Sequence, residues 1–214
     1  PSERLLAALP FALTGAQTRA IAEIRRDLAS GEQMGRLLQG DVGSGKTAVA
    51  ALALADAAAS GFQAALMAPT EILARQHYQR PAPMLEAAAV PTILLPGRDT
   101  PAERRPRLAA LASGEARVAI GTHALFQDAV RFDRLGLAVI DEQHRFGVNE
   151  RQRLQAKGDP RTGGVHLLTM SATPIPRTLE LTQYGELDVS RLTEKPPGRT
   201  PVTTAVLPLA RIGE

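Results

Sequence analysis

The sequence predicts an α/β fold: a mostly parallel sheet with helices on both faces. Short apolar runs alternate with helical patterns along most of the 214 residues, which is typical of βαβ units. A Gly-rich turn, "GDVGSGKT" at residues 40–47, joins an early strand to a helix. Two adjacent acids, Asp141 and Glu142, end a later apolar strand. Burying charge is costly unless it is paired or holds a metal, so these two acids indicate a site.

The first elements follow from capping and helical periodicity. Thr14 predicts a helix N-cap, because apolar residues repeat at helical spacing from Ala20 to Leu28. A short strand is expected at 36–39, followed by the Gly-rich turn. An alanine-rich helix then spans 46–60, with Gly61 as its C′ residue. A strand at 64–68 and a helix at 71–79 come next.

The second half continues the alternation. A strand is expected at 92–95, and the capping box Thr100–Glu103, with Pro at N1, begins a helix that ends near Gly114. Further strands are expected at 118–121, 137–141 and 165–170. From Glu194 the text "EKPPGRTPV" predicts a linker, and 202–207 one more strand. We therefore expect one domain over 1–193, with 194–214 forming a linker and the start of a connection to a further motor lobe.

Composition narrows the classes of function. The chain has no cysteine, which excludes disulfides, thiolate metal sites and a cysteine nucleophile. Its net charge is +3, and only three of its 25 basic residues are lysines. The many arginines indicate compositional bias in the first place, and a phosphate-binding face in the second. No apolar stretch is long enough for a membrane span and no secretory leader opens the chain, so a soluble cytoplasmic protein is expected.

The Gly-rich turn fits the phosphate-loop pattern G-x-x-x-x-G-K-[ST] between a strand and a helix. Glycines let backbone N–H groups converge on phosphate oxygens, and the helix N-terminus adds its dipole. The expected cofactors are ATP and Mg²⁺; the alternative is a chance glycine turn. Lys46 would reach the β and γ phosphates, and Thr47 would offer its hydroxyl to the ion. The candidate nucleotide ligands in this loop are Gly40, Gly43, Ser44, Gly45, Lys46 and Thr47.

The two acids fit the same chemistry. Ligands of open parallel sheets gather at the carboxyl ends of strands, where Asp141 stands. Asp141 would hold Mg²⁺ together with Thr47, and Glu142 would orient and deprotonate the attacking water. Lys46, Asp141 and Glu142 are thus the catalytic candidates. The alternative is an acidic helix N-terminus without chemistry.

Further motifs resemble those of superfamily 2 helicases. "LTGAQ" at 13–17 is similar to the Q motif, in which Gln17 would read the adenine edge. "APTEILARQH" at 68–77 resembles motif Ia, "GTHAL" at 121–125 the next strand-end motif, and "SATPIPRTL" at 171–179 motif III. Their order agrees across nearly the whole chain. "DEQHRFGV" and "PPGR" favour the members that translocate on double-stranded DNA; transcription-repair coupling factors are similar but carry Glu in place of Gln143.

This resemblance implies the first of two RecA-like motor lobes of an ATP-dependent DNA helicase. It assigns DNA backbone contacts to Thr70, Thr122 and His123. It assigns the coupling of hydrolysis to movement to His144, Ser171 and Thr173. The implied partners are branched double-stranded DNA, such as stalled forks and Holliday junctions, and a second motor lobe and an OB-type wedge domain in the same protein.

Two other functions remain open at this point. One is an RNA helicase lobe, although Asp141–His144 reads Asp-Glu-Gln-His and not Asp-Glu-Ala-Asp. The other is a nucleotide-binding module without turnover. In helicases of this kind the second lobe supplies arginine fingers, which contribute roughly 10³–10⁵ in rate. The chain alone is therefore expected to bind nucleotide weakly and to hydrolyse it slowly.

Overall fold

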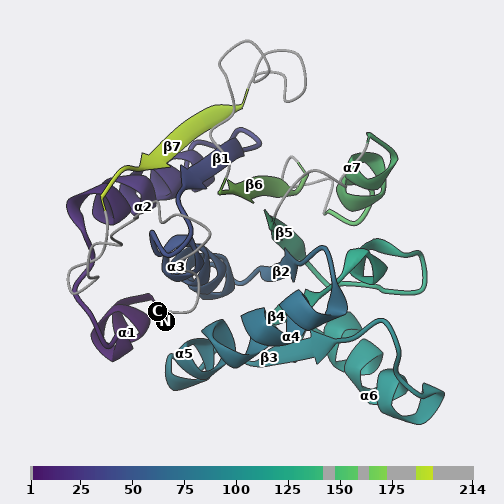
Figure 1. The fold of residues 1–214 in the computed structure, drawn as a ribbon. Coiled ribbons are helices and arrows are strands. Elements are labelled where there is room, and N and C mark those ends of the chain that lie inside the picture. Colours follow the sequence, from purple (N-terminus) through teal and green to yellow (C-terminus); the bar gives the residue numbers. More distant parts are fainter. Residues whose placement is uncertain (1, 142–147, 159–163, 173–186, 195–214) are drawn as a thin grey trace, which may run out of the picture.

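One seven-stranded parallel sheet organises the molecule (Figure 1). The computed structural model describes residues 2–141, 148–158, 164–172 and 187–194. Within them the strand order is β3-β4-β2-β5-β6-β1-β7, and every neighbouring pair is parallel. The expected α/β fold with a parallel sheet is confirmed.

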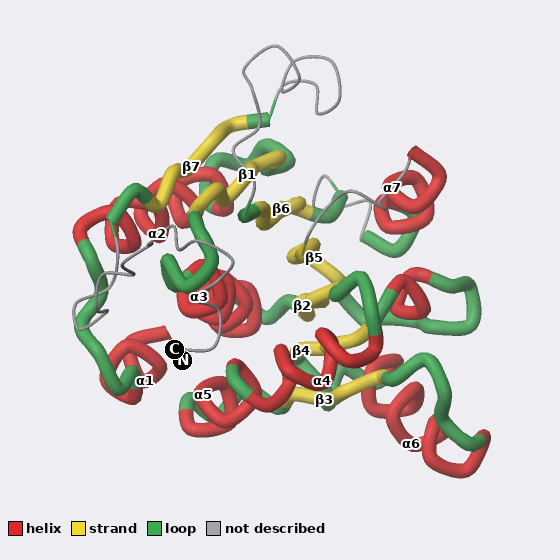
Figure 2. The backbone as a smooth tube through the Cα atoms, viewed as in Figure 1, coloured by secondary structure: helices red, strands yellow, loops and turns green. Residues whose placement is uncertain are grey.

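Helices and strands alternate along the described part of the chain (Figure 2). The strands are β1 (Gly35–Gly40), β2 (Gln63–Met67), β3 (Thr92–Leu95), β4 (Val118–Gly121), β5 (Leu135–Asp141), β6 (His166–Ser171) and β7 (Asp188–Leu192). The helices are α1 (Ser2–Ala8), α2 (Gly15–Leu28), α3 (Lys46–Ala59), α4 (Glu71–Gln79), α5 (Pro81–Ala87), α6 (Pro101–Ala112), the 3₁₀ turn η1 (His123–Phe126) and α7 (Val148–Gln155). Among these helices, none has the length and apolar character that a membrane crossing requires.

Apolar side chains cover both faces of the sheet. Successive strand residues point to opposite faces. Leu66 belongs to a buried cluster that includes residues of α1, α2, α3 and α5, whereas Ala65 belongs to a second cluster that includes residues of α6, η1 and α7. Such two-sided burial explains why the strands read as continuous apolar runs.

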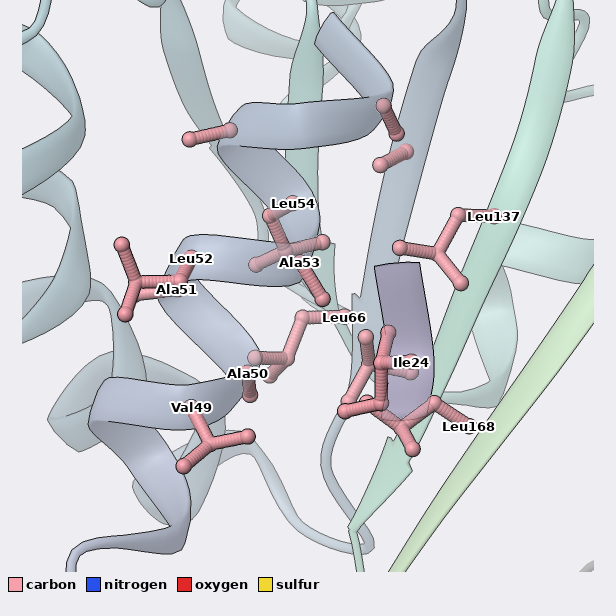
Figure 3. Packing of buried hydrophobic residues seen from close by; sticks show 14 of the residues in the cluster. Ile24, Val49, Ala50, Ala51, Leu52, Ala53, Leu54, Leu66, Leu137 and Leu168 are labelled. Atoms are coloured by element: carbon pink, nitrogen blue, oxygen red, sulfur yellow. The ribbon is translucent and has the colours of Figure 1, made fainter. Parts of the chain in front are cut away.

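Helix α3 lies almost entirely inside this core (Figure 3). Nine of its fourteen residues are buried, and most are alanines. The short alanine side chains share this cluster with Leu52 and Leu54, which are fully buried. The chain can therefore build a dense core with very few aromatic residues.

The local signals in the sequence match the observed elements. Thr14 and Thr100 both form capping boxes, with Gln17 and Glu103 respectively. Gly61 follows the end of α3 with φ +82°, the left-handed value expected of a C′ residue. The expected strands and helices agree with the observed bounds within two residues. The predicted linker and the strand at 202–207 lie outside the described residues, which reach only the first residue of the expected connecting segment.

Five elements were not expected: α1, α5, α7, β7 and the 3₁₀ turn η1. Helix α5 reads "PAPMLEA" and contains prolines at positions 81 and 83. Both occupy the first helical turn, where the backbone N–H groups have no intrahelical partner to lose. Strand β7 pairs with β1 from 152 residues further along the chain, so no local pattern indicates its partner.

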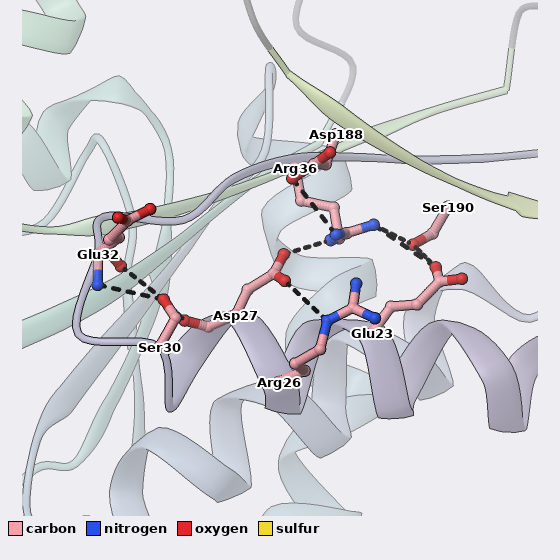
Figure 4. A network of polar contacts seen from close by, with 8 residues as sticks. All are labelled: Glu23, Arg26, Asp27, Ser30, Glu32, Arg36, Asp188 and Ser190. Carbon is pink, nitrogen blue, oxygen red and sulfur yellow. Dashed lines mark hydrogen bonds and ion pairs between the residues drawn. The ribbon is translucent and has the colours of Figure 1, made fainter.

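Strand β7 is fastened to β1 and α2 by a polar network around Arg36 (Figure 4). The Arg36 side chain is only 3% exposed. Its Nε donates to Oδ2 of Asp27 at 2.6 Å, and its Nη1 donates to Oγ of Ser190 at 2.9 Å. Ser190 also donates to the carboxylate of Glu23, and Asp188 lies 3.6 Å from Nη2. One guanidinium thus joins three elements.

We expect Arg36→Met to lower the free energy of unfolding by about 3 kcal/mol, because it leaves the carboxylates of Asp27 and Glu23 without their buried cation. Urea unfolding monitored by circular dichroism measures this. Arg26→Met is the matched control: Arg26 is 73% exposed and lies 3.8 Å from the same Asp27, so it should cost less than about 1 kcal/mol. Equal losses in the two variants would contradict a special role for the Arg36 network.

Candidate nucleotide-binding site

The phosphate loop leaves the carboxyl end of β1 and enters α3. Gly43 and Gly45 adopt φ values of +80° and +85°, a region that glycine enters without strain. Between them, the backbone N–H of Ser44 donates to the carbonyl of Asp41 at 3.1 Å and closes the turn. Gly45 is the N-cap of the 14-residue α3 and offers no side-chain cap. The positive end of this helix therefore lies at the loop, as anion binding requires.

Lys46 spans the loop from its first helical position. Its Nζ donates to the carbonyl of Gly40 at 2.5 Å and to the carbonyl of Asp41 at 3.0 Å. The ammonium therefore lies beside the residues that begin the loop, although the lysine itself follows the loop. A cation at this point is suited to balance phosphate charge.

Gln17 connects α2 to the phosphate loop. Its Nε2 donates to the carbonyl of Ser44 at 2.8 Å, and its Oε1 accepts the Thr14 N–H at 2.9 Å. The residue is 1% exposed. A Cβ at Gly45 would overlap the Gln17 amide nitrogen, so a side chain at position 45 would displace the amide of Gln17. Sequence reasoning assigned Gln17 to adenine and missed this structural role, although the capping box with Thr14 was a readable signal.

The loop opens into a cleft of about 250 Å³. The cleft lies where the loop, helix α4 and the carboxyl ends of β5 and β6 meet. Its lining residues are Val42, Gly43, Lys46, Thr47, Leu73, Gln76, His77, Arg80, Asp141, Met170 and Ala172. The fold thus brings Lys46, Thr47 and Asp141, which are distant in sequence, to one cavity.

Asp141 forms a hydrogen bond that the sequence did not reveal. Its Oδ2 lies 2.6 Å from Nε2 of His77, which stands in the last turn of α4. The two side chains are 16% and 13% exposed, so the contact is largely shielded from solvent. The residues are 64 positions apart, and His77 carries no motif of its own within "APTEILARQH".

The donor set of the cleft fits a magnesium nucleotide. A hydroxyl from Thr47 and a carboxylate from Asp141 are the hard oxygen ligands that Mg²⁺ prefers, with phosphates completing its shell. The ammonium of Lys46 and the N-terminus of α3 supply the positive charge that the phosphates need. These residues would hold the ion and the triphosphate.

The predicted DNA contacts stand at the same edge of the sheet. Thr70 is exposed and caps α4, since its Oγ1 accepts the Leu73 N–H at 3.3 Å. Thr122 is buried at the end of β4, and His123 is exposed at the start of η1. The backbone N–H of Ala68 donates to the carbonyl of Gly121 at 2.8 Å, so the segments that lead to Thr70 and Thr122 are joined directly.

The remaining candidates divide between described and undescribed segments. Ser171 ends β6 and is buried. Glu142, His144 and Thr173 lie outside the described residues.

A larger hollow of about 440 Å³ lies away from this chemistry, at the amino ends of β5 and β6. It is lined mostly by apolar groups, among them Phe62 and Leu137, together with His166. Burial lowers the pKa of His166, opposed by the charge of Asp27, and its Nδ1 accepts the Met34 N–H at 3.0 Å. The imidazole serves as a structural acceptor there, and the residues that line this hollow include none of the candidate phosphate-loop ligands.

We expect Gly45→Ala to weaken nucleotide affinity more than about tenfold, a loss above ~1.4 kcal/mol. The methyl group would displace Gln17 and force an unfavourable φ, so the loop would shift. Titration with a fluorescent ADP measures the affinity. Gly31→Ala is the control for a strained glycine-to-alanine change outside the loop and should leave ADP affinity unchanged, because Gly31 has φ +79° with nothing near its Cβ position. If both variants bind ADP like the wild type, the Gln17 contact does not shape the loop.

Comparison with known proteins identifies the family. The DEAD/DEAH box helicase family matches residues 14–182. The ATP-dependent DNA helicase RecG of Escherichia coli K12 is 52% identical over 208 residues, which cover 97% of this chain and 30% of that protein. The RecG of Thermotoga maritima is 50% identical over 213 residues, covering 100% of this chain and 27% of that protein. The chain thus spans less than a third of the length of these relatives.

Solved structures agree with these sequence matches. A structure of RecG bound to a three-way DNA junction is 47% identical with a TM-score of 0.84, covering 99% of this chain and 28% of that one. The DEAD-box helicase Mss116 bound to single-stranded RNA is 18% identical with a TM-score of 0.69, covering 91% and 43%, and shows a shared fold. The expected RecA-like fold is confirmed, and the chain belongs to the DEAD/DEAH box helicase family.

Proposed function

We propose that this chain is the ATP-binding motor lobe of a DNA translocase that remodels branched DNA, such as stalled forks and recombination junctions. One observation carries the proposal: Lys46, Thr47 and Asp141 line a single cleft at the carboxyl edge of the sheet. The substrate class is supported by identities near 50% to RecG helicases, one of which was solved with a three-way DNA junction.

In the proposed reaction each polar group of the cleft has its own task. The Lys46 ammonium balances the charge of the β and γ phosphates, and Thr47 and Asp141 hold the ion. Mg²⁺ would neutralise charge that develops on the phosphate oxygens during transfer. Glu142, the next residue after Asp141, orients the attacking water and accepts its proton. Gln17 holds the loop and reads the adenine edge with the remaining hydrogen-bonding capacity of its amide.

The DNA side of the proposal uses the ends of β2 and β4. Thr70 with the N–H groups that begin α4, and Thr122 with His123, would contact phosphates of the DNA backbone. Such contacts position the duplex without reading its sequence, as a translocase requires. Ser171, with His144 and Thr173, would pass the state of the nucleotide to a second motor lobe, and a wedge domain would engage the branch point.

An RNA helicase is the less favoured alternative. The relatives near 50% identity are named DNA helicases, whereas the RNA-bound neighbour shares only 18% identity and supports the fold alone. A nucleotide-binding module without turnover is opposed by the presence of Lys46, Thr47 and Asp141 in one cleft.

The proposal predicts the stimulation of ATP hydrolysis by nucleic acids. In a full-length protein that carries this chain, a three-way DNA junction should raise the rate more than linear duplex DNA or single-stranded RNA. Lys46→Ala should reduce the junction-stimulated kcat more than tenfold, a loss above ~1.4 kcal/mol, with the circular dichroism spectrum unchanged. Phosphate release measures both. Greatest stimulation by RNA would favour the alternative, and an active Lys46→Ala variant would remove this lysine from the mechanism.

A second prediction separates the two acids in the same full-length protein. Asp141→Asn should weaken the binding of Mg²⁺-ATP, because it removes a charge beside the ion. Glu142→Gln should bind ATP almost normally and stop hydrolysis, because it removes the base and keeps the shape. Nucleotide titration and single-turnover hydrolysis of both variants provide the comparison. Equal loss of affinity in the two, or cleavage at the wild-type rate by Glu142→Gln, would contradict this division of roles.

A further inference from the structure

The hydrogen bond between His77 and Asp141 joins two elements that both line the cleft. Asp141 ends β5 in the middle of the sheet, and His77 stands in the last turn of α4. Their Nε2 and Oδ2 atoms are 2.6 Å apart, which is a short hydrogen bond, and bonds to a charged group are shorter than those between neutral groups. Because an ionised carboxylate can only accept, the imidazole N–H is the donor. The bond engages one carboxylate oxygen and restrains the rotation of the group.

Helix α4 presents a regular face to the cleft. Leu73, Gln76 and His77 of α4 line the cleft together with Arg80, the C-cap residue of the helix, at the spacing i, i+3, i+4, i+7. Other residues of α4 pack into the protein: Ala74 is buried, and Tyr78 packs against the hydrophobic cluster that contains Leu66. It also contacts β3, β4 and α5. His77 is thus presented by a packed helix, which makes it a firm partner for a side chain on another element.

The carboxylate of Asp141 alone would not have a fixed orientation. Its two side-chain torsions can rotate, and only a second contact selects one arrangement. Hydrogen bonds to ligating carboxylates supply this selection in metal sites, and the loss of such a partner typically reduces metal affinity about 10–100-fold. The 2.6 Å bond, 13% exposure of His77 and origin on a packed helix give it the properties of such a partner.

We propose that His77 is a positioning residue that orients Asp141 for the magnesium ion of the bound nucleotide. The imidazole N–H holds Oδ2, so the second oxygen of the carboxylate is presented in a fixed direction. In this role His77 acts through Asp141 and is not itself a ligand of the ion. This inference rests on the proposed function, because it concerns the ion that Asp141 holds there.

The opposite role would have a different signature. If the bond to His77 competed with the ion for Asp141, removal of the imidazole would tighten the binding of Mg²⁺-nucleotide. If His77 only stabilised the fold, its loss would weaken nucleotide binding to the same extent with and without Mg²⁺. A positioning role predicts a loss confined to the Mg²⁺-dependent part of the affinity.

The test measures the affinity for a ribose-labelled fluorescent ADP, with Mg²⁺ and with EDTA in its place, in the full-length protein. His77→Ala should lose about tenfold or more in the presence of Mg²⁺ and nothing in EDTA. His77→Gln should retain most of the Mg²⁺-dependent affinity, because the Gln amide nitrogen reaches the position of Nε2. Gln79→Ala is the matched control, since Gln79 is exposed on the same helix and lies outside the cleft lining.

Each outcome decides one question. Tighter binding by His77→Ala, unchanged binding, or an equal loss with and without Mg²⁺ would overturn the positioning role. The same holds if His77→Gln is as defective as His77→Ala. A wild-type protein that binds ADP without any effect of Mg²⁺ would refute the proposed ion site itself, which distinguishes failure of the proposed function from failure of the role of His77.

Discussion

Parallel pairing of all seven described strands directs their carboxyl ends to the same edge of the sheet. Each return connection must then cross a face, which buries both faces under helices and demands apolar residues at nearly every strand position. The phosphate loop, Thr70, Thr122, Asp141 and Ser171 all follow or end strands at this edge. Residues that are distant in sequence therefore lie at one edge of the sheet. The parallel arrangement brings them together, so the segments that connect them need no sequence motif of their own.

Helix α2 fixes the strand that carries the phosphate loop at both of its ends. Near the C-terminus of α2, Asp27 binds Arg36 at the start of β1. Near its N-terminus, Gln17 binds the carbonyl of Ser44 just after β1 ends. The same helix thus sets the position of the strand through an ion pair and the shape of the loop through an amide. Strand β7 adds a third support, because Ser190 and Asp188 contact Arg36 and Leu192 lies close to Gly40.

The sequence predicted what local chemistry determines. The side chains of Thr14 and Thr100 indicate where two helices begin, and the backbone preference of Gly61 indicates where a third one ends. The apolar runs indicate the strands. The sequence did not predict contacts between segments that are far apart along the chain. Neither β7 beside β1 nor the bond from His77 to Asp141 has a local signature, because the fold alone brings these segments together. For the site, the motif named candidate nucleotide ligands in the phosphate loop, but not the contacts that hold the loop.

The contact between Gln17 and the loop also limits how this chain can vary. A side chain at position 45 meets the amide of Gln17, and a shorter residue at position 17 loses the bond to the Ser44 carbonyl. Removing the obstacle does not make position 45 permissive, because φ of +85° still disfavours any residue with a Cβ. The effects of substitutions at the two positions are therefore not additive. A substitution of Gln17 or Gly45 alone disturbs the phosphate loop. Selection for nucleotide binding would therefore retain both residues together, even if neither residue contacted the nucleotide.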